Sequence, residues 1–407
     1  MSKTVAVLAT LDTKGAEAEF LRQQIGKLGG KAMLVDLGVL GQPATRADVA
    51  REDVARAGGS ELAQLQKQPT RETAQPVMVA GATRLLVAAV ERGEVHAVLG
   101  LGGLQGTAAC TQIMRALPYG LPKVMVSTVA SGNTSAYVDI KDITMMFSVG
   151  DILGLNDFTR KILANAAGAA WGMAQVGTIV RAEKRAKPLI GMTNLGVLTE
   201  GAMHALELFA QQGYEAIVFH AVGSGGRAME QMMKEGIIGA VFDYALGEIS
   251  DELFEALRAG TPERLTVAGE LGLPQVLCPG GTEHLGLLVE PNSVPAAWRD
   301  HRYVFHSPVV LAPRLNADEF VRVAKEIGTR LQHTKGKAVM MLPLDGTSRY
   351  GKEGGPLRDS DGDAAFFAAL RQALPESVEV VEMHTHAEDP KFVEAAVDRL
   401  IGLIEGR

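Results

Sequence analysis

Short apolar runs alternate with longer segments of helical periodicity along the chain. In the first part the runs occupy residues 4–9, 32–36, 95–100, 123–127 and 143–149. Uninterrupted aliphatic and β-branched runs are typical of strands that are buried on both faces of a parallel sheet. The segments between them are long enough for crossover helices. The pattern predicts an α/β fold.

An alanine-rich segment and a change in composition end the first part. Residues 156–177 have helical periodicity, and we expect their apolar face to pack between domains or subunits. The chain then turns polar and basic before a proline and a new apolar run. We expect two domains, 1–180 and 188–407, joined by a linker at 181–187.

The second part repeats the order of strand, loop and helix. Its runs occupy residues 189–192, 216–220, 238–243, 338–342 and 378–382. A chain of 407 residues is also too long for one ordinary core. The sequence therefore predicts two Rossmann-like subdomains, each a mainly parallel sheet flanked by helices.

Composition narrows the class of partner. Hydrophobic residues make up 47% and charged residues 21%, which is typical of a globular protein. The net charge of −7 argues against nucleic acid and anionic membranes and favours small metabolites. We find no apolar run long enough to cross a bilayer, and Cys110 and Cys278 are typical of reduced thiols. We expect a cytoplasmic protein.

A glycine-rich loop at residues 100–107 carries the strongest chemical signal. It follows a predicted strand and opens a helix, so its amides and the helix dipole favour an anion such as phosphate. No Lys-Ser or Lys-Thr follows Gly106, so the loop is not a Walker A motif. A tight turn between strand and helix is the structural alternative.

Two further loops are expected beside it. Lys14 follows the first strand and is placed to neutralise a phosphate or carboxylate, whereas Asp12 or Thr13 is equally well explained as a helix cap. Residues 127–134 offer several hydroxyls and a glycine. If their strands are neighbours, the three loops form one anion cradle.

The second domain has its own glycine loop, after a strand that ends at His220. We expect a small anionic ligand at Gly223, Ser224, Gly225, Gly226 and Arg227. Arginine binds carboxylates and phosphates through two parallel hydrogen bonds. The alternative is a glycine turn followed by a solvated arginine.

Other polar groups are candidates for chemistry in the second domain. Glu283 and His284 form an acid–base pair or a capped helix start, and Asp345 and Ser348 are expected to contact substrate. The catalytic candidates are His220, Arg227, Glu283, His284 and Asp345.

Two patterns that suggest metals are set aside. The alternation of His384 and His386, near Asp389, would place both imidazoles on one face of a strand, as a metal site requires, but we prefer the interpretation that these are solvated polar residues. The acidic residues 359, 361 and 363 imitate a calcium loop, but Ala364 and Leu370 replace its glycine and glutamate. We expect no metal held by the protein alone.

Motifs along nearly the whole chain resemble the ATP-binding domain family of the tomato mosaic virus resistance protein and its bacterial relatives. They are LDTKG, GLGGLQGT, STVASGNT, DILGLNDFTRKILANAAGAAWGM, VFHAVGSGGRAMEQM, LGLPQVLCPGG and PLDGTSRYGKEGGPLRDSDGDAAFF. The chain departs from the family at residues 282–285 and 306–308, which leaves the ligand of the second domain open.

The resemblance implies ATP, with or without Mg, and a homodimer. The nucleotide contacts that it implies are Asp12, Thr13, Lys14, Gly102, Gly103, Gly106, Thr107, Ser127, Thr128, Ser131 and Gly132.

Three functions agree with these features. The first is an enzyme that uses ATP on a small acidic metabolite bound between the two domains. The second is a non-catalytic binding protein that depends on ATP. The third is a lyase or hydrolase in which the nucleotide is only regulatory.

Overall fold

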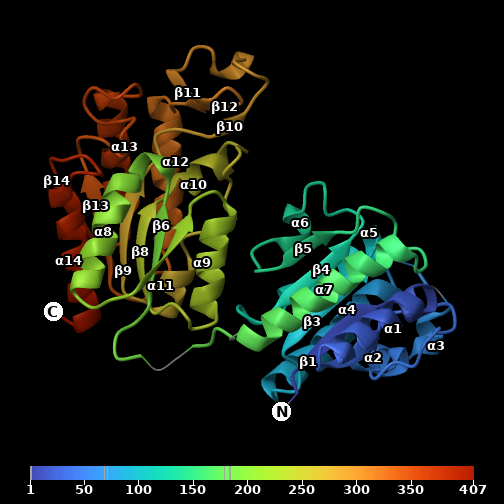
Figure 1. Ribbon diagram of the computed structural model, residues 1–407. Helices are drawn as coiled ribbons and strands as arrows, with labels where there is room; N and C mark the ends of the chain where they lie inside the picture. The colour runs from blue at the N-terminus through green and yellow to red at the C-terminus, as the bar shows by residue number, and fades with distance from the viewer. Residues whose placement is uncertain (1, 68, 71, 178, 183–184) are drawn as a thin grey trace. The chain divides into compact units, whose positions relative to one another are not determined.

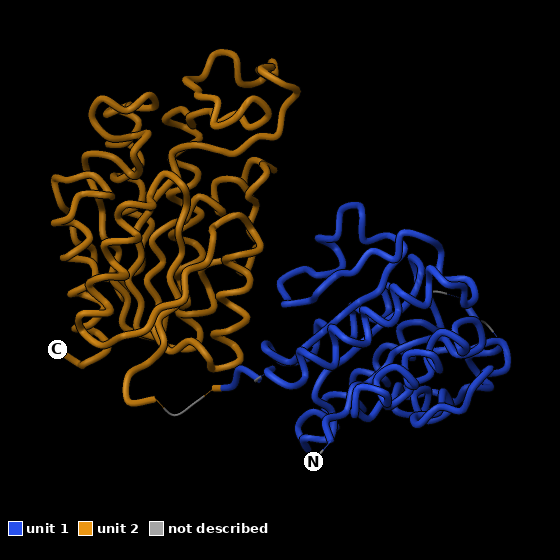
Figure 2. The backbone as a smooth tube through the Cα atoms, in the orientation of Figure 1, with its two compact units in different colours: residues 1–181 blue, residues 182–407 orange. Residues whose placement is uncertain are grey.

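Two parallel sheets organise the chain, as Figure 1 shows. The computed structural model describes residues 2–67, 69–70, 72–177, 179–182 and 185–407. The chain divides into two compact units, Met1–Arg181 and Ala182–Arg407, which Figure 2 draws in different colours. The division lies at the start of the expected linker 181–187, of which residues 183 and 184 are outside the described part.

The sheet of unit 1 has the strand order β2-β1-β3-β4-β5, and all its pairings are parallel. Its strands are β1 (Thr4–Ala9), β2 (Lys31–Asp36), β3 (Ala97–Gly102), β4 (Lys123–Ser127) and β5 (Thr144–Phe147). All five overlap the predicted runs. Because β1 leads to β2 on one side and the chain then crosses to β3 on the other, the connections reverse direction between β1 and β3.

Helices cover both faces of this sheet. One face carries α1 (Leu11–Lys27) and α7 (Asp157–Val176), and the other carries α2 (Arg51–Ala57), α3 (Leu62–Leu65), α4 (Ala74–Glu91) and α5 (Leu104–Arg115). The short α6 (Ser135–Val138) follows β4. Alternate residues of β1 serve the two cores: Val5 and Val7 pack toward α1 and α7, whereas Ala6 and Leu8 pack toward α2, α4 and α5. A continuous apolar run is therefore what this strand requires.

Helix α7 confirms the predicted helix 156–177 but not its expected role. Asn156 caps its first turn by accepting hydrogen bonds from the N–H groups of Phe158 and Thr159. Its small apolar side chains, among them Ala167 and Ala170, are buried against α1 and the sheet of unit 1. The expectation that this face packs between domains or subunits is wrong, because small side chains let the helix lie directly on its own sheet.

The main sheet of unit 2 has the order β14-β13-β9-β8-β6-β7 and is also parallel. Its strands are β6 (Ile190–Asn194), β7 (Ala216–His220), β8 (Ala240–Ala245), β9 (Gln275–Gly280), β13 (Ala338–Pro343) and β14 (Val378–Met383). The order reverses between β6 and β8. The prediction of two Rossmann-like, mainly parallel sheets flanked by helices is confirmed.

The helices of unit 2 again form two layers. The 3₁₀ turn η1 (Gly196–Leu198), α8 (Thr199–Gln211) and α14 (Pro390–Glu405) pack on one face. The opposite face carries α9 (Ser224–Lys234), α10 (Gly247–Leu253), α11 (Val267–Leu271), α12 (Ala317–Leu331) and α13 (Ser360–Ala373). Phe320 of α12 stacks on Phe366 of α13 with 3.9 Å between ring centroids, which anchors these two helices to each other.

A small antiparallel sheet was not predicted. It consists of β10 (Leu287–Leu288), β12 (Val310–Pro313) and β11 (Tyr303–Ser307), and the 3₁₀ turn η2 (Ala296–Trp298) lies between β10 and β11. Its strands are short and partly exposed, so they lack the continuous apolar run that marks the parallel strands.

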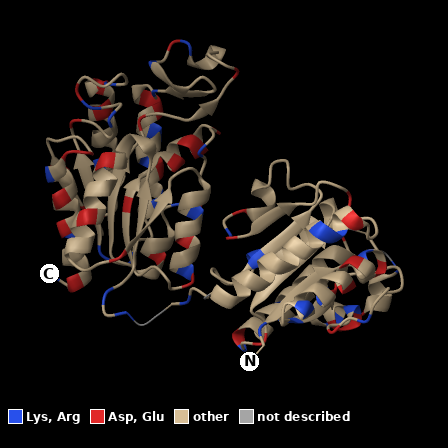
Figure 3. Ribbon diagram, viewed as in Figure 1, with Lys and Arg blue, Asp and Glu red and all other residues tan. Residues whose placement is uncertain are grey.

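Charged side chains gather on the helices and loops, while most strand positions carry none, as Figure 3 shows. No helix in the described ranges is long and apolar enough to cross a bilayer.

Candidate functional site

A cleft of about 550 Å³ lies beyond the carboxyl ends of the strands of unit 1. The start of α1, residues 37–40 after β2, the turn between β3 and α5, and α4 all contribute to its lining. This is where the connections reverse direction, the usual position of a ligand in a doubly wound sheet. The volume falls within the range of about 300–1,000 Å³ typical of small-molecule sites. The predicted nucleotide contacts that line it are Asp12, Thr13, Lys14, Gly102, Gly103 and Gly106.

The glycines of the β3–α5 turn differ in what they permit. A Cβ on Gly102 would lie 2.7 Å from the Cα of Gly106, so the close approach of these two backbone segments requires a glycine at 102. A Cβ on Gly103 would meet only the Oγ1 of Thr128, at an ordinary 3.6 Å. Gly103 has a negative φ of −79°. The turn itself therefore does not require glycine at 103, a position that lines the cleft.

The start of α5 directs its amides to the same place. Gly103 is the N-cap, and the first helical backbone bond runs from the N–H of Thr107 to the oxygen of Gly103 at 2.8 Å. The N–H groups of residues 104–106 have no acceptor within the helix, because the first turn precedes the carbonyls that would bind them. The helix has 12 residues, so its dipole adds attraction for an anion at this end.

Thr107 and Ser127 lie beneath the turn rather than in the cleft. Both side chains are fully buried, and their hydroxyl oxygens are 2.7 Å apart. The Oγ of Ser127 also accepts a hydrogen bond from the N–H of Val129. The two residues join α5 to the loop after β4. Their predicted contact with a nucleotide is untested, and their position is that of support.

The loop after β4 lies next to the cleft, but none of its residues lines it. Thr128 lies beside Gly103, and its N–H donates to the oxygen of Gly102 at 3.3 Å. Ser131 and Gly132 are exposed, and neither lines the cleft. Two of the three predicted loops are thus brought together, while the third contributes its first residues beside them.

The loop after β1 is fixed by several contacts. Helix α1 is kinked at Lys14, whose φ of −126° and ψ of 20° are not helical. The alternative that Asp12 or Thr13 caps this helix is wrong, because among the described residues neither side chain accepts a hydrogen bond from an amide of α1. Lys14 donates from Nζ to the carbonyl oxygen of Ile152. The Oδ2 of Asp12 accepts the N–H of Gly41 at 3.1 Å, whereas its Oδ1 is buried without a hydrogen-bond partner.

Asp36 is a positioning residue that the sequence reasoning missed. It ends β2 and is 1% exposed, and its Oδ1 accepts the N–H of Leu11 at 3.0 Å and the N–H of Gly38 at 2.8 Å. The carboxylate thereby joins two of the loops that line the cleft. Burial raises the pKa of Asp36, against the effect of these two hydrogen bonds. An acidic residue at the last position of an apolar run was the available signal.

The glycine loop of unit 2 already binds a carboxylate of its own chain. The N–H groups of Gly223 and Gly226 donate to Oε1 of Glu248 at 2.5 and 3.2 Å. A Cβ on Gly225 would lie 1.8 Å from the oxygen of His220. These contacts give the loop a structural explanation. Its role as a substrate-anion site is untested, but two of its amides are occupied internally.

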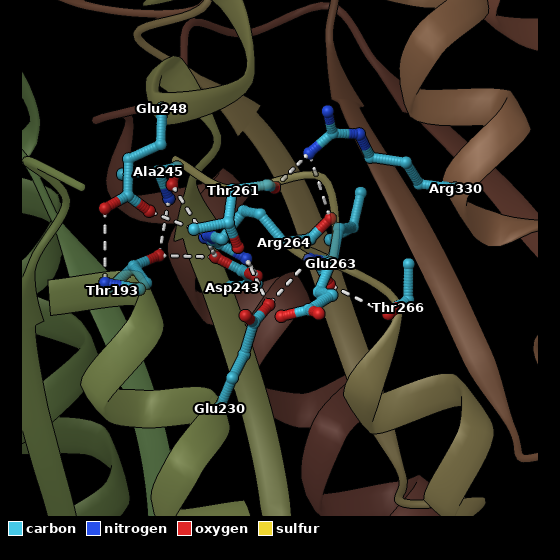
Figure 4. Close-up of polar contacts among 12 residues, drawn as sticks. Thr193, Glu230, Asp243, Ala245, Glu248, Thr261, Glu263, Arg264, Thr266 and Arg330 are labelled. Carbon is cyan, nitrogen blue, oxygen red and sulfur yellow. Dashed lines mark hydrogen bonds and ion pairs between the residues drawn. The ribbon is translucent and has the colours of Figure 1, made fainter. Parts of the chain in front are cut away.

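A buried ionic cluster fills the point where the connections of unit 2 reverse, as Figure 4 shows. Arg264 is 0% exposed and donates to both oxygens of Asp243 at 2.6 and 2.7 Å. It also donates from Nε to Glu248 at 2.7 Å, and Glu230 lies 3.6 Å away. Thr193 donates to Asp243 at 2.7 Å. Burial raises the pKa of Glu230 to about 7. Unit 1 has an open cleft at the corresponding position.

Glu283 and His284 form a buried pair, but not the start of a helix, since residues 281–284 have no helical structure. Glu283 accepts hydrogen bonds from Thr347, at 2.7 Å, and from Ser348. Burial raises the pKa of Glu283, but the charge of His284 and these hydrogen bonds outweigh it and hold the pKa well below its usual range. In an acid–base triad the hydroxyl contacts the imidazole. Here the Ser348 hydroxyl and the His284 imidazole each contact the carboxylate of Glu283 instead. The arrangement leaves Ser348 buried and not activated as a nucleophile.

The catalytic candidates are not assembled in one place. His220 is exposed at the end of β7, and Arg227 is half-buried on α9. Asp345 follows β13, and β6, β8 and β9 separate that strand from β7. Within the described residues no group of three or more His, Cys, Asp or Glu side chains is arranged to hold a metal ion.

These features define a two-unit α/β protein with a ligand-sized cleft at the switch point of its first doubly wound sheet. Residues 3–178 match the N-terminal domain, and residues 187–404 the C-terminal domain, of the uncharacterised protein family (UPF0261). The chain belongs to the UPF0261 family.

Relatives agree with this membership. A UPF0261 protein of Clostridium tetani is 37% identical over 100% of both chains. The ToMV resistance protein Tm-1(GCR237) of Solanum lycopersicum is 30% identical over 75% of this chain and 41% of the tomato protein. The resemblance to the family of the virus resistance protein is thereby confirmed. Among solved structures, MurG of Acinetobacter baumannii is similar at 14% identity and a TM-score of 0.21, covering 100% of both chains, and nothing follows from so slight a likeness.

Proposed function

We propose that unit 1 binds ATP in the cleft between the start of α1 and the start of α5. The observation that carries this proposal is Gly103. It lines the cleft, and neither the φ of its backbone nor its neighbours require a glycine there. A phosphate close to the backbone is a reason for the missing side chain, because only glycine lets an anion approach the amides this closely.

The phosphates would bind at the start of α5. The amides of residues 104–106 and the positive end of the helix dipole favour negative charge there. Lys14 lines the same cleft. Its ammonium group donates one hydrogen bond to the oxygen of Ile152, which leaves two N–H donors for phosphate oxygens.

The base would occupy the apolar wall of the cleft. Leu37 and Val39 follow β2, and Met78 and Val79 lie on α4, and all four line the cleft. Apolar walls with a few polar groups are typical of small-molecule sites, because the walls supply the burial and the polar groups set the orientation.

The cleft also fits the magnesium ion that accompanies ATP. Asp12 and Asp151 line it, and the Oδ1 of Asp12 is buried without a partner. Mg²⁺ is usually held by one or two carboxylates together with phosphate oxygens and water, so a complete set of protein ligands is not needed. Asp12, assisted by Asp151, would hold the ion, which would offset the negative charge of the phosphates.

ATP binding is the part of the expected function that the cleft supports. A reaction on a small acidic metabolite finds no support in the glycine loop of unit 2, where Glu248 takes the place of an external anion.

The test is calorimetric titration of the full chain with ATP and Mg²⁺, with adenosine and inorganic triphosphate as partial ligands. We expect Gly103→Asp to weaken ATP binding about a hundredfold or more, because it places a negative side chain at the phosphate position. Gly172→Asp is the matched control, since a Cβ at Gly172 has no neighbour within 4 Å. Failure of wild type to bind ATP, or equal binding by Gly103→Asp, would refute the proposal.

A further inference from the structure

A second cleft, of about 610 Å³, opens in unit 2 beyond the carboxyl ends of β13 and β14. Two loops form it, residues 345–360 and 384–389. Backbone hydrogen bonds join the loops, from the N–H of Asp345 to the oxygen of Thr385 at 3.0 Å and from the N–H of Ala387 to the oxygen of Gly346 at 2.9 Å. The cleft is therefore held open by fixed backbone. Carboxyl ends of parallel strands are where α/β proteins bind ligands.

The first loop supplies a cation, Lys352, that forms no ion pair with any residue that the structure describes. Lys352 lines the cleft, and within the described residues its ammonium forms no hydrogen bond either. Arg358 lines the cleft as well, but its Nη1 donates to the buried Asp363 at 2.6 Å. Ser360, also in the lining, begins α13, but the carboxylate of Asp359 already caps this helix by accepting the N–H of Gly362. Lys352 is therefore the group of this loop that is available to an anion. The same loop also brings the carboxylate of Glu353 into the lining, so it presents charges of both signs.

The carboxylate of Asp345 also lines the cleft, and it has no hydrogen-bond or ion-pair partner among the described residues. Asp389 lines the cleft from the second loop, and its side chain caps α14 by accepting the N–H of Lys391. Lys352 and Asp345 thus share one cleft without forming an ion pair. Opposite charges that are held apart by fixed backbone remain available to a ligand that carries both signs.

Neutral polar groups also line this cleft. The Oγ1 of Thr385 is buried without a partner, and a buried polar atom normally has one. His386 accepts the N–H of Glu388 at its Nδ1, 3.2 Å away, which leaves Nε2–H as a donor when the ring is neutral. Burial, assisted by the charge of Lys352, lowers the pKa of His386, so the neutral form prevails at neutral pH.

Two alternatives are less suited to this unit. Its switch point between β6 and β8 is filled by the buried Arg264 and its carboxylates. A metal site would need a group of ligands that the described residues do not provide around His384 and His386.

We infer that the cleft beyond β13 and β14 binds a free amino acid, with its carboxylate toward Lys352 and its ammonium toward Asp345. The ligand would form ion pairs with two side chains, Lys352 and Asp345, that form none with the described residues. This inference concerns unit 2 and stands apart from ATP binding in unit 1.

The test begins with a thermal-shift screen of the full chain against the twenty standard L-amino acids at millimolar concentration. The amino acid with the largest shift is then compared, by calorimetry, with its carboxamide and with its N-acetyl form. We expect each derivative to bind about tenfold or more weakly, because each removes one charge-assisted contact. No shift with any amino acid would overturn the inference, as would equal shifts with glycolate or inorganic phosphate, which would indicate a plain anion site.

Paired variants assign the two ends of the ligand. Lys352→Gln should weaken the amino acid but leave the carboxamide unchanged, and Asp345→Asn should weaken the amino acid but leave the N-acetyl form unchanged. Lys325→Gln and Asp300→Asn, at exposed positions outside the cleft, are the matched controls. If both cleft variants bind the amino acid as tightly as the controls do, the site is wrong.

Discussion

Arg264 and Asp243 are joined by two parallel hydrogen bonds of 2.6 and 2.7 Å in the interior of unit 2. Both side chains are buried, and Glu248 accepts a hydrogen bond from the same guanidinium. The guanidinium offsets the desolvation cost of the buried carboxylates around it. Without it, each carboxylate would be buried with no opposite charge beside it.

Replacing Arg264 by methionine should therefore destabilise the protein by about 3–5 kcal/mol, since it leaves buried carboxylates without a partner. Urea unfolding followed by circular dichroism measures this loss. Arg399→Met is the control, because Arg399 pairs with Glu379 in an exposed ion pair, and such pairs contribute roughly 0–1 kcal/mol. Equal losses in the two variants would contradict the importance of the buried cluster.

Glu230 should make stability depend on pH. Its pKa of about 7 in the folded protein lies above the ordinary value of 4.5. The folded state therefore binds the proton more tightly, and this contribution is full below about pH 4.5 and is lost as the pH rises through about 7. Glu230→Gln removes the titration, so its stability relative to wild type should increase between pH 5 and pH 8. The increase is on the order of 3 kcal/mol at most, as one pKa unit corresponds to about 1.4 kcal/mol. A relative stability that is constant over this range would show that Glu230 is ionised throughout.

The two adjacent glycines at 102 and 103 should separate stability from binding. Gly102→Ala forces a Cβ to within 2.7 Å of the Cα of Gly106, so we expect a loss of about 1–3 kcal/mol in unfolding free energy. Gly103→Ala meets no such obstacle, so its unfolding free energy should stay close to wild type while its affinity for ATP falls. Urea unfolding and calorimetry on the same preparations give both quantities. The opposite assignment, with Gly103→Ala unstable and able to bind, would contradict the account of the turn.

Asp36 should act through the loops that it joins. Asp36→Ala leaves the N–H groups of Leu11 and Gly38 without their acceptor, at roughly 1–3 kcal/mol for each buried group. Its ATP affinity should fall as well, because both loops line the cleft. Asp36→Asn keeps one acceptor oxygen and should recover much of the stability and affinity. If the asparagine variant resembles the alanine variant, the role of these hydrogen bonds is wrong.

The parallel strands could be predicted because their signal is local. Residues 4–9, 123–127 and 216–220 are apolar runs whose bounds agree with β1, β4 and β7. The glycine-rich loop could also be predicted from the sequence, because a turn between a strand and a helix is recognised from neighbouring residues. The small sheet β10–β12 escaped prediction because its two-residue and four-residue strands carry no comparable run.

The partners of buried charges could not be predicted, because they depend on strand order. Glu248 meets the amides of Gly223 and Gly226 across 22 to 25 residues of sequence, and nothing near either end indicates the contact. The same holds for Asp36 with Leu11. For this reason the sequence predicts an external anion at the glycine loop of unit 2, where the structure shows that two of the loop's amides bind Glu248 of the same chain.

The carboxylate of Glu248 at the start of α9 belongs to the same chain as the helix. A diffusible anion occupies a helix end only in proportion to its concentration, whereas a tethered one is present at a high and constant effective concentration. The carboxylate at that helix start is therefore present at any dilution of the protein, without a contribution from anions in solution.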